Sequence, residues 1–465
     1  MSPRNQVTTT APQETPVQSG ARHGWALLAT SLGFAVVQLD VSVVNVAIKP
    51  IGAAFGGGVA ALQWVVNAYT LAFAALILTA GALGDRIGAK RVFVAGFALF
   101  TLASAVCGLA PDLAVLIGAR AVQGIGAAVL VPCSLTLLNH TYSRPADRAR
   151  AVGLWSAGAS TALSAGPLVG GVLTETLGWR AIFFINAPIG VFGILLTLRR
   201  ARETSRSAGR GIDLPGQLTA VVALTALAGA MIEGGARGFT DPLVLAGFAV
   251  TALAGALFVL VETRSARPML PPRLFRAPSF GPATAIGLLV NIAFYGLIFV
   301  LSLFFQRQQH YSALLTGLAF APMTVAIVLA NLTAGRLSGR LGARRLIICG
   351  ALLMGGGCAG LLGFGASAPY PALVGQLTAL GFGLGLIVPA MTAALLGSVE
   401  RERSGVASGT LNTARQTGSV LGVALFGSLL AGTGSLVPGL HLALAISVGL
   451  VGAVIAVAFG IRQTG

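Results

Sequence analysis

Charged residues are scarce in this chain of 465 residues. Asp, Glu, Lys and Arg together make up 9 % of the sequence, whereas hydrophobic residues make up 55 %. A soluble domain normally carries about 25 % charged residues. The composition therefore excludes an ordinary soluble protein, and it predicts a chain that is surrounded by the lipid bilayer.

Cysteine and histidine are also rare, with four of each. The cysteines are Cys107, Cys133, Cys349 and Cys358, and all lie in apolar runs without metal-ligand spacing. Their small number excludes a disulfide scaffold, and we expect no metal site. The histidines form no ligand or triad pattern, and a phosphate-binding loop of the G-x-x-x-x-G-K-[ST] type is missing. These absences argue against an enzyme and against an ATP-driven pump.

Acidic residues are outnumbered, because 13 Asp and Glu stand against 30 Lys and Arg, for a formal net charge of +17. A basic excess of this size often indicates a nucleic-acid-binding protein. Here 28 of the 30 basic residues lie between apolar runs, with 24 on one side of the expected membrane and four on the other, and the remaining two lie within runs. Because positive loops stay in the cytoplasm, we expect both termini there, in a multi-pass protein of the cell membrane without a nucleic acid partner.

Long apolar runs recur fourteen times along the chain. A helix needs about 20 apolar residues to cross a bilayer, and in lipid its backbone has to satisfy its own hydrogen bonds. We therefore expect an all-α polytopic membrane protein with 14 transmembrane helices, preceded by a disordered cytoplasmic tail over residues 1–24. The runs cover residues 25–48, 62–83, 91–109, 113–138, 151–173, 182–198, 214–233, 242–261, 280–304, 314–334, 345–366, 371–396, 405–431 and 439–461.

An internal repeat divides the chain. Residues 81–91 match residues 335–345 at an offset of 254 positions, and two further Gly-containing matches follow in the same order. The repeat predicts an N-terminal six-helix bundle over 25–198, a linker with two inserted transmembrane helices over 199–279, and a C-terminal six-helix bundle over 280–465. Internal repeats of this kind are typical of secondary transporters, whose site lies near the middle of the bilayer.

Several motifs, in order along the chain, resemble those of the major facilitator superfamily, and in particular its fourteen-helix drug:proton antiporter branch. Gly-x-Leu-x-Asp-Arg-x-Gly-x-Lys-Arg at 81–91 resembles the loop motif of the family, and Arg-x-x-Gln-Gly at 120–124 resembles its fourth-helix motif. The glycines and proline of 158–171 resemble the fifth-helix antiporter motif, and segments 39–47 and 179–190 resemble signatures of the branch. The resemblance implies a gating or conformational role for Asp85, Arg86, Gly88, Arg91, Gly158, Gly166, Pro167 and Gly170, although packing alone is the alternative for the helical Gly and Pro positions.

One acidic residue, Asp40, lies deep within a predicted span. An ionisable residue in a membrane helix is a functional candidate, because burying its charge is costly. Arg120 lies at a comparable depth on a helix that runs in the opposite direction, so we expect the two side chains to pair. We predict that Asp40 carries a coupled proton and that Arg120 sets its proton affinity; a static structural pair is the alternative.

Other polar residues inside predicted spans are candidates for the substrate cavity. In the span 405–431, four polar side chains besides Arg415 share one helical face, which predicts a cavity or a polar helix contact. Glu233 and Glu262 lie at span ends and are expected to extend to the membrane surface. The cavity candidates are Asn45, Asn67, Gln123, Asn291, Tyr295, Asn412, Arg415 and Gln416.

Together these features predict a secondary active exporter of hydrophobic drug-like or antibiotic molecules. We expect it to exchange substrate for protons by alternating access, as a monomer, driven by the proton gradient without a cofactor. Two arginines against one aspartate in the spans make neutral or weakly acidic substrates at least as plausible as cations. A metabolite transporter on the same fold is the alternative, and a membrane-embedded enzyme or scaffold is the weaker one.

Overall fold

A computed structural model shows how these segments fold. It describes residues 16–142, 144–204, 213–265, 268–270, 272–365, 367–400, 404–432 and 435–462, and within these ranges all regular structure is helical. The first fifteen residues of the predicted tail and residues 205–212 of the predicted linker lie outside the described residues. Each apolar run identified in the sequence lies mainly on one helix or on two consecutive helices.

The first half of the chain forms a bundle in which α1 packs on α5 and α4 packs on α2 and α3. Its first helix begins at Pro16, so part of the segment predicted as a disordered tail is helical instead. Proline fits the first helical turn, and the residues after it continue the helix without a break. The helices are α1 (Pro16–Phe55), α2 (Val59–Ile87), α3 (Ala89–Leu109), α4 (Leu113–Thr141), α5 (Pro145–Leu177), α6 (Ala181–Phe184) and α7 (Asn186–Arg200).

The second half forms a similar bundle, in which α12 packs on α13 and α10 packs on α14 and α15. A π-helical segment, η2, continues the end of α10, and α12 bends sharply at Gly342. The elements are η1 (Pro272–Arg276), α10 (Phe280–Leu303), η2 (Phe304–Gln308), α11 (Ala313–Ala319), α12 (Ala321–Leu361), α13 (Tyr370–Gly397), α14 (Ser404–Gly432) and α15 (Leu436–Ala458).

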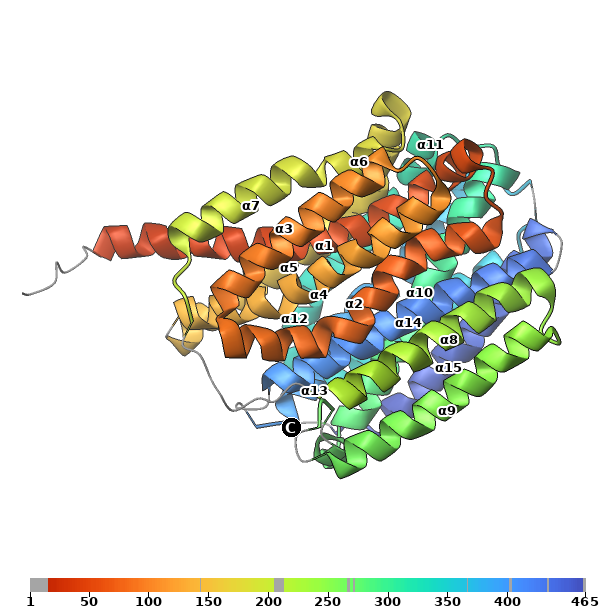
Figure 1. The fold of residues 1–465 in the computed structure, drawn as a ribbon. Helices are drawn as coiled ribbons and strands as arrows, with labels where there is room; N and C mark the ends of the chain where they lie inside the picture. Colours follow the sequence, from red (N-terminus) through yellow and green to blue (C-terminus); the bar gives the residue numbers. More distant parts are fainter. Residues whose placement is uncertain are drawn as a thin grey trace, which may run out of the picture.

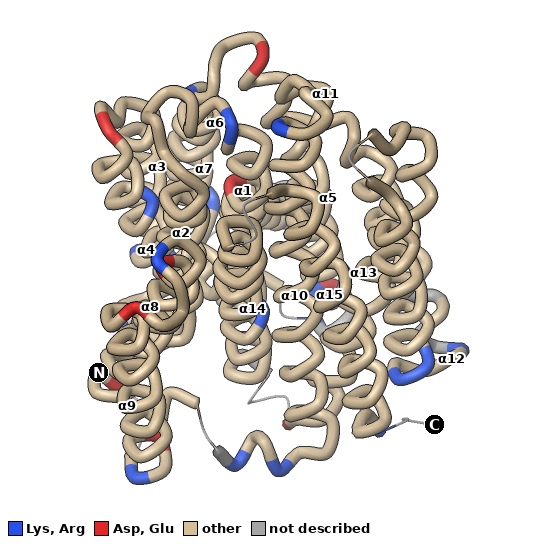
Figure 2. The backbone as a smooth tube through the Cα atoms, turned by 90° about the vertical axis from the view of Figure 1, so that its right-hand side faces the viewer, with Lys and Arg blue, Asp and Glu red and all other residues tan. Residues whose placement is uncertain are grey.

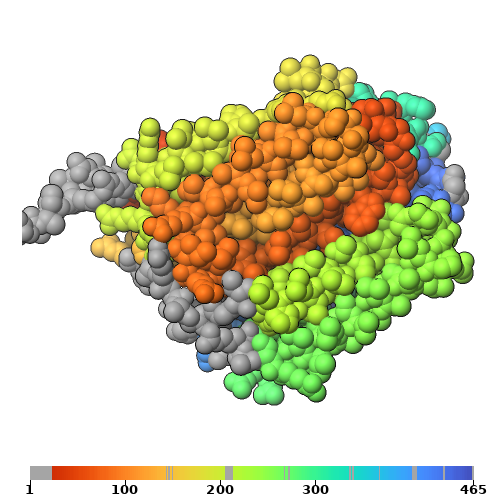
Figure 3. All heavy atoms as spheres, in the orientation of Figure 1, coloured from red at the N-terminus to blue at the C-terminus, as the bar shows by residue number. Residues whose placement is uncertain are grey.

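Two helices, α8 (Leu214–Arg237) and α9 (Pro242–Arg264), lie between the halves in sequence and on one side of them in space (Figure 1). The helix α8 contacts α2 of the first half and α14 of the second. The helix α9 packs on α8, and the space-filling view shows the two side by side along the edge of the molecule (Figure 3). The inserted helices therefore cover one line along which the halves meet.

Twelve helical segments in the described residues are long and apolar enough to cross a membrane. The long helices α5 and α14 are not among them, because Gly, Ser and Thr make up much of their sequence. Arginines gather at one end of the bundle, at the end of α9, in η1 and around the bend of α12 (Figure 2). The structure is thus a bundle of long apolar helices in which arginines are concentrated at one end.

The internal repeat is visible in the backbone at two glycines. Gly88, between α2 and α3, has φ +113°, and Gly342, at the bend of α12, has φ +74°. The two positions are related by the 254-residue offset of the sequence match. A side chain rarely adopts such angles, so both turns need glycine. The repeated segment is therefore a turn between two consecutive helices in each half.

Candidate functional site

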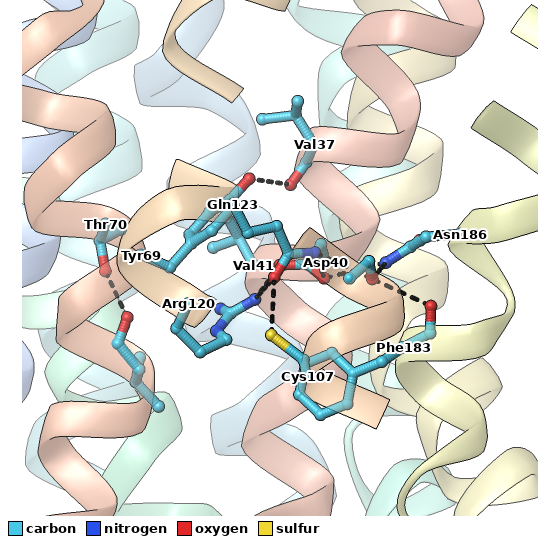
Figure 4. Close-up of polar contacts among 12 residues, drawn as sticks. Val37, Asp40, Val41, Tyr69, Thr70, Cys107, Arg120, Gln123, Phe183 and Asn186 are labelled. Atoms are coloured by element: carbon cyan, nitrogen blue, oxygen red, sulfur yellow. Dashed lines mark hydrogen bonds and ion pairs between the residues drawn. The ribbon is translucent and has the colours of Figure 1, made fainter. Parts of the chain in front are cut away.

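The centre of the first bundle contains a buried ion pair between α1 and α4. Arg120 Nη1 donates to Asp40 Oδ2, and the two side chains are 1 % and 0 % exposed. Arg120 Nε donates to the backbone oxygen of Val65 on α2, at 3.1 Å. The pairing expected from helix direction and depth is confirmed (Figure 4).

Amide side chains complete the surroundings of the carboxylate. Gln123 Nε2 donates to Asp40 Oδ1 at 2.9 Å, and its Oε1 accepts from Arg120 Nη1 at 2.7 Å. Asn186 Nδ2, at the start of α7, donates to the same Asp40 oxygen at 3.1 Å. Both carboxylate oxygens are thus bound by donors from other helices, which stabilises the charge of this buried group.

Ser104 on α3 connects these amides. Its hydroxyl accepts from Gln123 Nε2 at 3.1 Å and from Asn186 Nδ2 at 2.9 Å, and it donates to the backbone oxygen of Phe183 at 2.9 Å. The network therefore draws on α1, α3, α4, α6 and α7. No role for Ser104 or Asn186 was predicted from the sequence; the one signal is that Asn186 lies within the segment 179–190, which resembles a signature of the branch.

Gln123 lies within the ion-pair network. It was expected in the substrate cavity, but its side chain is fully buried and bound on both sides by the ion pair and Ser104. The helical spacing explains this position, because residues three apart on α4 lie on the same face as Arg120. We therefore assign Gln123 to the ion-pair network.

Aromatic rings enclose the cation. The guanidinium carbon of Arg120 lies 4.3 Å from the ring centroid of Tyr69 and 5.7 Å from that of Phe183. The hydroxyl of Tyr69 donates to the backbone oxygen of Val37 on α1, at 3.3 Å (Figure 4). These contacts supply a cation–π attraction that does not depend on the carboxylate.

The asparagines predicted to line a cavity are all in the interior, but most donate within their own helix. The amides of Asn45, Asn291 and Asn412 donate to the backbone oxygens four residues earlier, at 3.1, 2.7 and 3.0 Å. Asn67 differs, because it is fully buried and neither atom of its amide has a partner. A buried amide without hydrogen bonds is costly, so Asn67 is the asparagine best suited to receive a ligand.

In the second half, α14 presents Arg415 toward α10. A Cβ on Gly287 of α10 would lie 3.3 Å from Arg415 Cγ, and Arg415 and Tyr295 interact electrostatically. The Nε of Arg415 and the Oε1 of Gln416 are buried without partners. Arg415 therefore lies at the contact of α10 and α14, and both Arg415 and Gln416 have unused hydrogen-bonding capacity.

The loop motif of residues 81–91 is held by the segment that follows α7. Glu203 Oε1 accepts from the backbone nitrogen of Lys90 at 2.9 Å, and Glu203 Oε2 lies 3.7 Å from Arg91 Nε. Thr204 Oγ1 accepts from the backbone nitrogen of Ala89, also at 2.9 Å. A Cβ on Gly88 would lie 2.7 Å from Glu203 Oε1.

Three acidic residues lie in loops or at helix ends, and two of them, Glu203 and Glu262, have contacts that were not predicted. Glu203 binds the first turn of α3, a role that nothing in the sequence indicates beyond an acidic residue soon after an apolar run. Asp85 is half-buried and Arg86 is exposed next to it. Glu262 was expected to reach the membrane surface; instead it is 5 % exposed, because the chain folds back and Leu270 donates to its carboxylate at 3.0 Å.

The α5 motif lies where α5 crosses α1 and α11. A Cβ on Gly166 or Gly170 would lie 2.7 Å from Ser42 Cβ or Val43 Cγ2 of α1. The backbone oxygen of Pro167 closely approaches α11, 2.3 Å from where a Cβ of Gly317 would lie. Close packing thus requires these glycines, whereas a Cβ at Gly158 would meet nothing within 4 Å.

The two halves are joined by hydrogen bonds at the end of the bundle where α1 ends and α2 begins. Lys49 Nζ donates to the backbone oxygen of Gln306 at 2.7 Å, and Gln306 Nε2 donates to that of Val46 at 2.9 Å. Gln63 Nε2 donates to two backbone oxygens of α14, at 2.8 and 2.9 Å. These bonds close this end of the interface between the halves.

Comparison with known proteins places the chain in a family. The Major Facilitator Superfamily matches residues 30–422 and, separately, residues 283–464. The Methylenomycin A resistance protein of Streptomyces coelicolor is 39 % identical over 431 residues, which cover 92 % of this chain and 90 % of that protein. The Multidrug resistance protein Stp of Mycobacterium tuberculosis is 38 % identical over 405 residues, which cover 87 % and 75 %.

A solved structure shares the fold. The crystal structure of a bacterial homologue of the human lysosomal transporter Spinster, in an inward-facing and unoccupied conformation, matches with a TM-score of 0.67 and 18 % identity, over 96 % of this chain and 97 % of that one. The sequence relatives are resistance proteins rather than enzymes. The chain therefore belongs to the Major Facilitator Superfamily, in the branch of its antibiotic- and multidrug-resistance relatives.

Proposed function

We propose that this protein exports small, largely hydrophobic molecules of the antibiotic type across the cell membrane in exchange for protons. The observation that carries the proposal is the buried Asp40–Arg120 pair in a family member whose relatives are named for antibiotic and multidrug resistance. A carboxylate whose surroundings alternate between this cation and a desolvated cavity can take up and release a proton.

Protonation of Asp40 would release Arg120 from its counter-ion. The guanidinium would keep its bonds to Val65 and Gln123 and its contact with the ring of Tyr69. Because these partners lie on α2 and α4, the cation would stay with those helices while α1 loses its attraction to them. The proton would thus change how α1 is held in the first bundle.

The same helix would transmit this change to the interface between the halves. Val46, six residues after Asp40, accepts from Gln306, and Lys49 donates to the same η2 residue. Asp40 and Val46 lie on the same helix, α1. Weakening the Asp40–Arg120 pair can therefore weaken the contact of α1 with Gln306. Alternating access would follow as the hydrogen bonds at this end break and the opposite end closes.

The substrate would bind between the halves. Arg415 and Gln416 of α14 and Asn67 of α2 each carry buried atoms without partners, which a polar group of the substrate could satisfy. Because Arg120 already neutralises Asp40 and Arg415 adds a second cation, neutral or weakly acidic molecules suit the site better than cations. No cofactor is needed in this mechanism.

The arrangement in the membrane follows the arginines. We propose fourteen spans, including α5 and α14, with both termini and the arginine-rich end of the bundle in the cytoplasm. The end joined by Lys49, Gln306 and Gln63 would then face outward. A single chain contains every part of this mechanism, so a monomer suffices.

The test is transport in inverted membrane vesicles with an imposed proton gradient. The parent should accumulate methylenomycin A only while the gradient is maintained, and Asp40→Asn should abolish gradient-driven accumulation while substrate binding persists. Asp112→Asn is the matched control, because Asp112 caps α4 at its exposed N-terminus and asparagine caps equally well. Gradient-driven accumulation by Asp40→Asn at the rate of the control would disprove the proton-coupling role.

A further inference from the structure

A second pair of acidic residues is buried at the base of the inserted helices, remote in sequence from the ion pair. Asp213 precedes α8 and is 9 % exposed, and Glu262 lies in the last turn of α9 and is 5 % exposed. Neither residue takes part in the proposed exchange of substrate for protons. Acidic residues are seldom buried without a cation or a set of donors, so this pair needs a physical explanation.

Each carboxyl group is bound through only one of its oxygens. Asp213 Oδ1 accepts from the backbone nitrogen of Gly216 at 2.9 Å, and Glu262 Oε2 accepts from that of Leu270 at 3.0 Å. The other oxygens, Asp213 Oδ2 and Glu262 Oε1, are buried and have no partner.

The two unpartnered oxygens converge on one place. A Cβ built on Gly216 would lie 2.9 Å from Asp213 Oδ2 and 2.9 Å from Glu262 Oε1. Both oxygens therefore border the same small gap, which glycine leaves open, and the two residues interact electrostatically. Two ionised carboxylates in this position would repel each other without any compensating donor.

Within the part of the chain that the structure describes, the groups next to this pair are neutral. Thr79 of α2 contacts Gln217 of α8, and Gln217 Nε2 donates to a backbone oxygen of α2 at 2.6 Å. Arg264, two residues after Glu262, is exposed, and Arg273 and Arg276 of η1 are also exposed. Among the described residues, Asp213 is the charged group that acts on Glu262.

We propose that Asp213 and Glu262 form a proton-binding site, in which one proton is shared between Asp213 Oδ2 and Glu262 Oε1. A shared proton turns one carboxyl into a donor, satisfies both unpartnered oxygens and removes the repulsion between them. The site titrates as a pair: it holds the proton at lower pH and loses it when both groups ionise at higher pH.

The position of the site gives it a structural consequence. Asp213 starts α8, and Glu262 holds the segment that leads from α9 to the second half through Leu270. Loss of the proton would separate the two carboxylates and loosen this segment. Leu270 is thus held more firmly by Glu262 when the pair is protonated than when it is ionised.

Two measurements on the purified full-length protein in lipid nanodiscs test this site, and neither needs transport. Infrared difference spectra recorded across a pH titration should contain the carbonyl band of a protonated carboxyl, which disappears as the pH is raised. The band should be lost in Asp213→Asn/Glu262→Gln and kept in Glu233→Gln, the control, whose glutamate is partly exposed and paired with Arg237. A band that is unchanged in the double variant would overturn the proposal.

The second measurement follows opening of the segment. Met269→Cys, made together with Cys349→Ser, is labelled by a maleimide over a range of pH. Labelling should rise more steeply with pH in this background than when Asp213→Asn is added, because an amide at that position keeps the α8 cap and donates to Glu262 at every pH. Equal pH dependence in both proteins would overturn the proposed opening.

Neither readout involves Asp40. A negative result in these measurements therefore leaves the exporter proposal intact, and failure of the exporter proposal leaves this site intact.

Discussion

The side chain of Glu203 occupies the space next to Gly88 that any larger residue at that position would need. A Cβ there would lie 2.7 Å from Glu203 Oε1, and the backbone of Gly88 has φ +113°. The carboxylate also caps α3 through Lys90 and pairs with Arg91. Glu203, just after the last helix of the first bundle, therefore packs against the turn at Gly88 and binds the start of α3.

We expect Gly88→Ala to be damaging for two independent reasons. Alanine would be strained at this φ, which costs about 1–3 kcal/mol, and its Cβ would displace Glu203 from the start of α3. The measurement is thermal unfolding of the purified protein in detergent. Glu203→Ala should lower the melting temperature by less, because it removes the cap without straining the turn. A melting temperature for Gly88→Ala equal to that of the parent would contradict the expected strain.

The ion pair predicts a specific pattern of stability. Arg120→Met leaves Asp40 buried without its cation and should destabilise the protein by about 3–5 kcal/mol. Adding Asp40→Asn removes the unpaired charge and should restore most of that stability, whereas neither protein should transport against a gradient. Melting temperature and vesicle uptake measured on the three variants separate the two effects. A double variant no more stable than Arg120→Met would show that the pair is not the source of the loss.

Arg120→Lys tests whether the geometry of the guanidinium matters beyond its charge. Arginine binds Val65, Asp40 and Gln123 from one planar group and lies over the ring of Tyr69. Lysine keeps the charge but cannot make these contacts together, so we expect folding to persist and uptake to fall at least about tenfold, equivalent to about 1.4 kcal/mol. Uptake equal to that of the parent would limit Arg120 to a simple counter-charge.

Some of this site could be predicted from the sequence, and the reasons are physical. Asp40 and Arg120 are rare charges in apolar helices of opposite direction, so their depth could be compared by counting residues. Ser104 and Asn186 could not be assigned in this way, because their partners depend on the rotation of α3 and α7 about their axes. Small polar residues occur in many membrane helices for packing alone.

The arrangement of the chain ends and linkers was harder to predict. Glu262 and Glu203 lie where apolar runs give way to polar segments, and whether such a carboxylate reaches solvent depends on how the following segment folds back. Backbone nitrogens of Leu270 and Lys90 bind them in the structure. These contacts join segments through the backbone, which leaves no pattern of side-chain types in the sequence.

The α5 motif allows a direct test of packing against bending. Gly158→Ala should fit, because a Cβ there meets nothing within 4 Å, and it should leave the melting temperature equal or higher, since alanine favours a helix by up to about 1 kcal/mol. Gly166→Ala should lower the melting temperature, because its Cβ would lie 2.7 Å from Ser42 Cβ.

If α5 bends at Gly158 during transport, Gly158→Ala will transport more slowly despite its stability. Normal uptake by Gly158→Ala would assign that glycine no role in bending, and normal stability of Gly166→Ala would contradict the close contact of α5 with α1.

Arg415 predicts which molecules the protein accepts. Its Nε is buried without a partner beside Tyr295, on the half that contributes no acid to the ion pair. Arg415→Gln removes a positive charge but keeps a hydrogen-bond donor, so uptake of acidic compounds should fall while uptake of neutral compounds is nearly retained. The positive charge of Arg415 repels cationic compounds in the parent. The variant should therefore transport cationic compounds better than the parent does. The measurement is vesicle uptake of a matched set of acidic, neutral and cationic antibiotics. The control is Ser428→Ala, which alters the same helix without changing charge and removes only a hydroxyl that donates to the backbone of α14. A uniform reduction for all three classes in Arg415→Gln would show that Arg415 supports the fold of α14 rather than the choice of substrate.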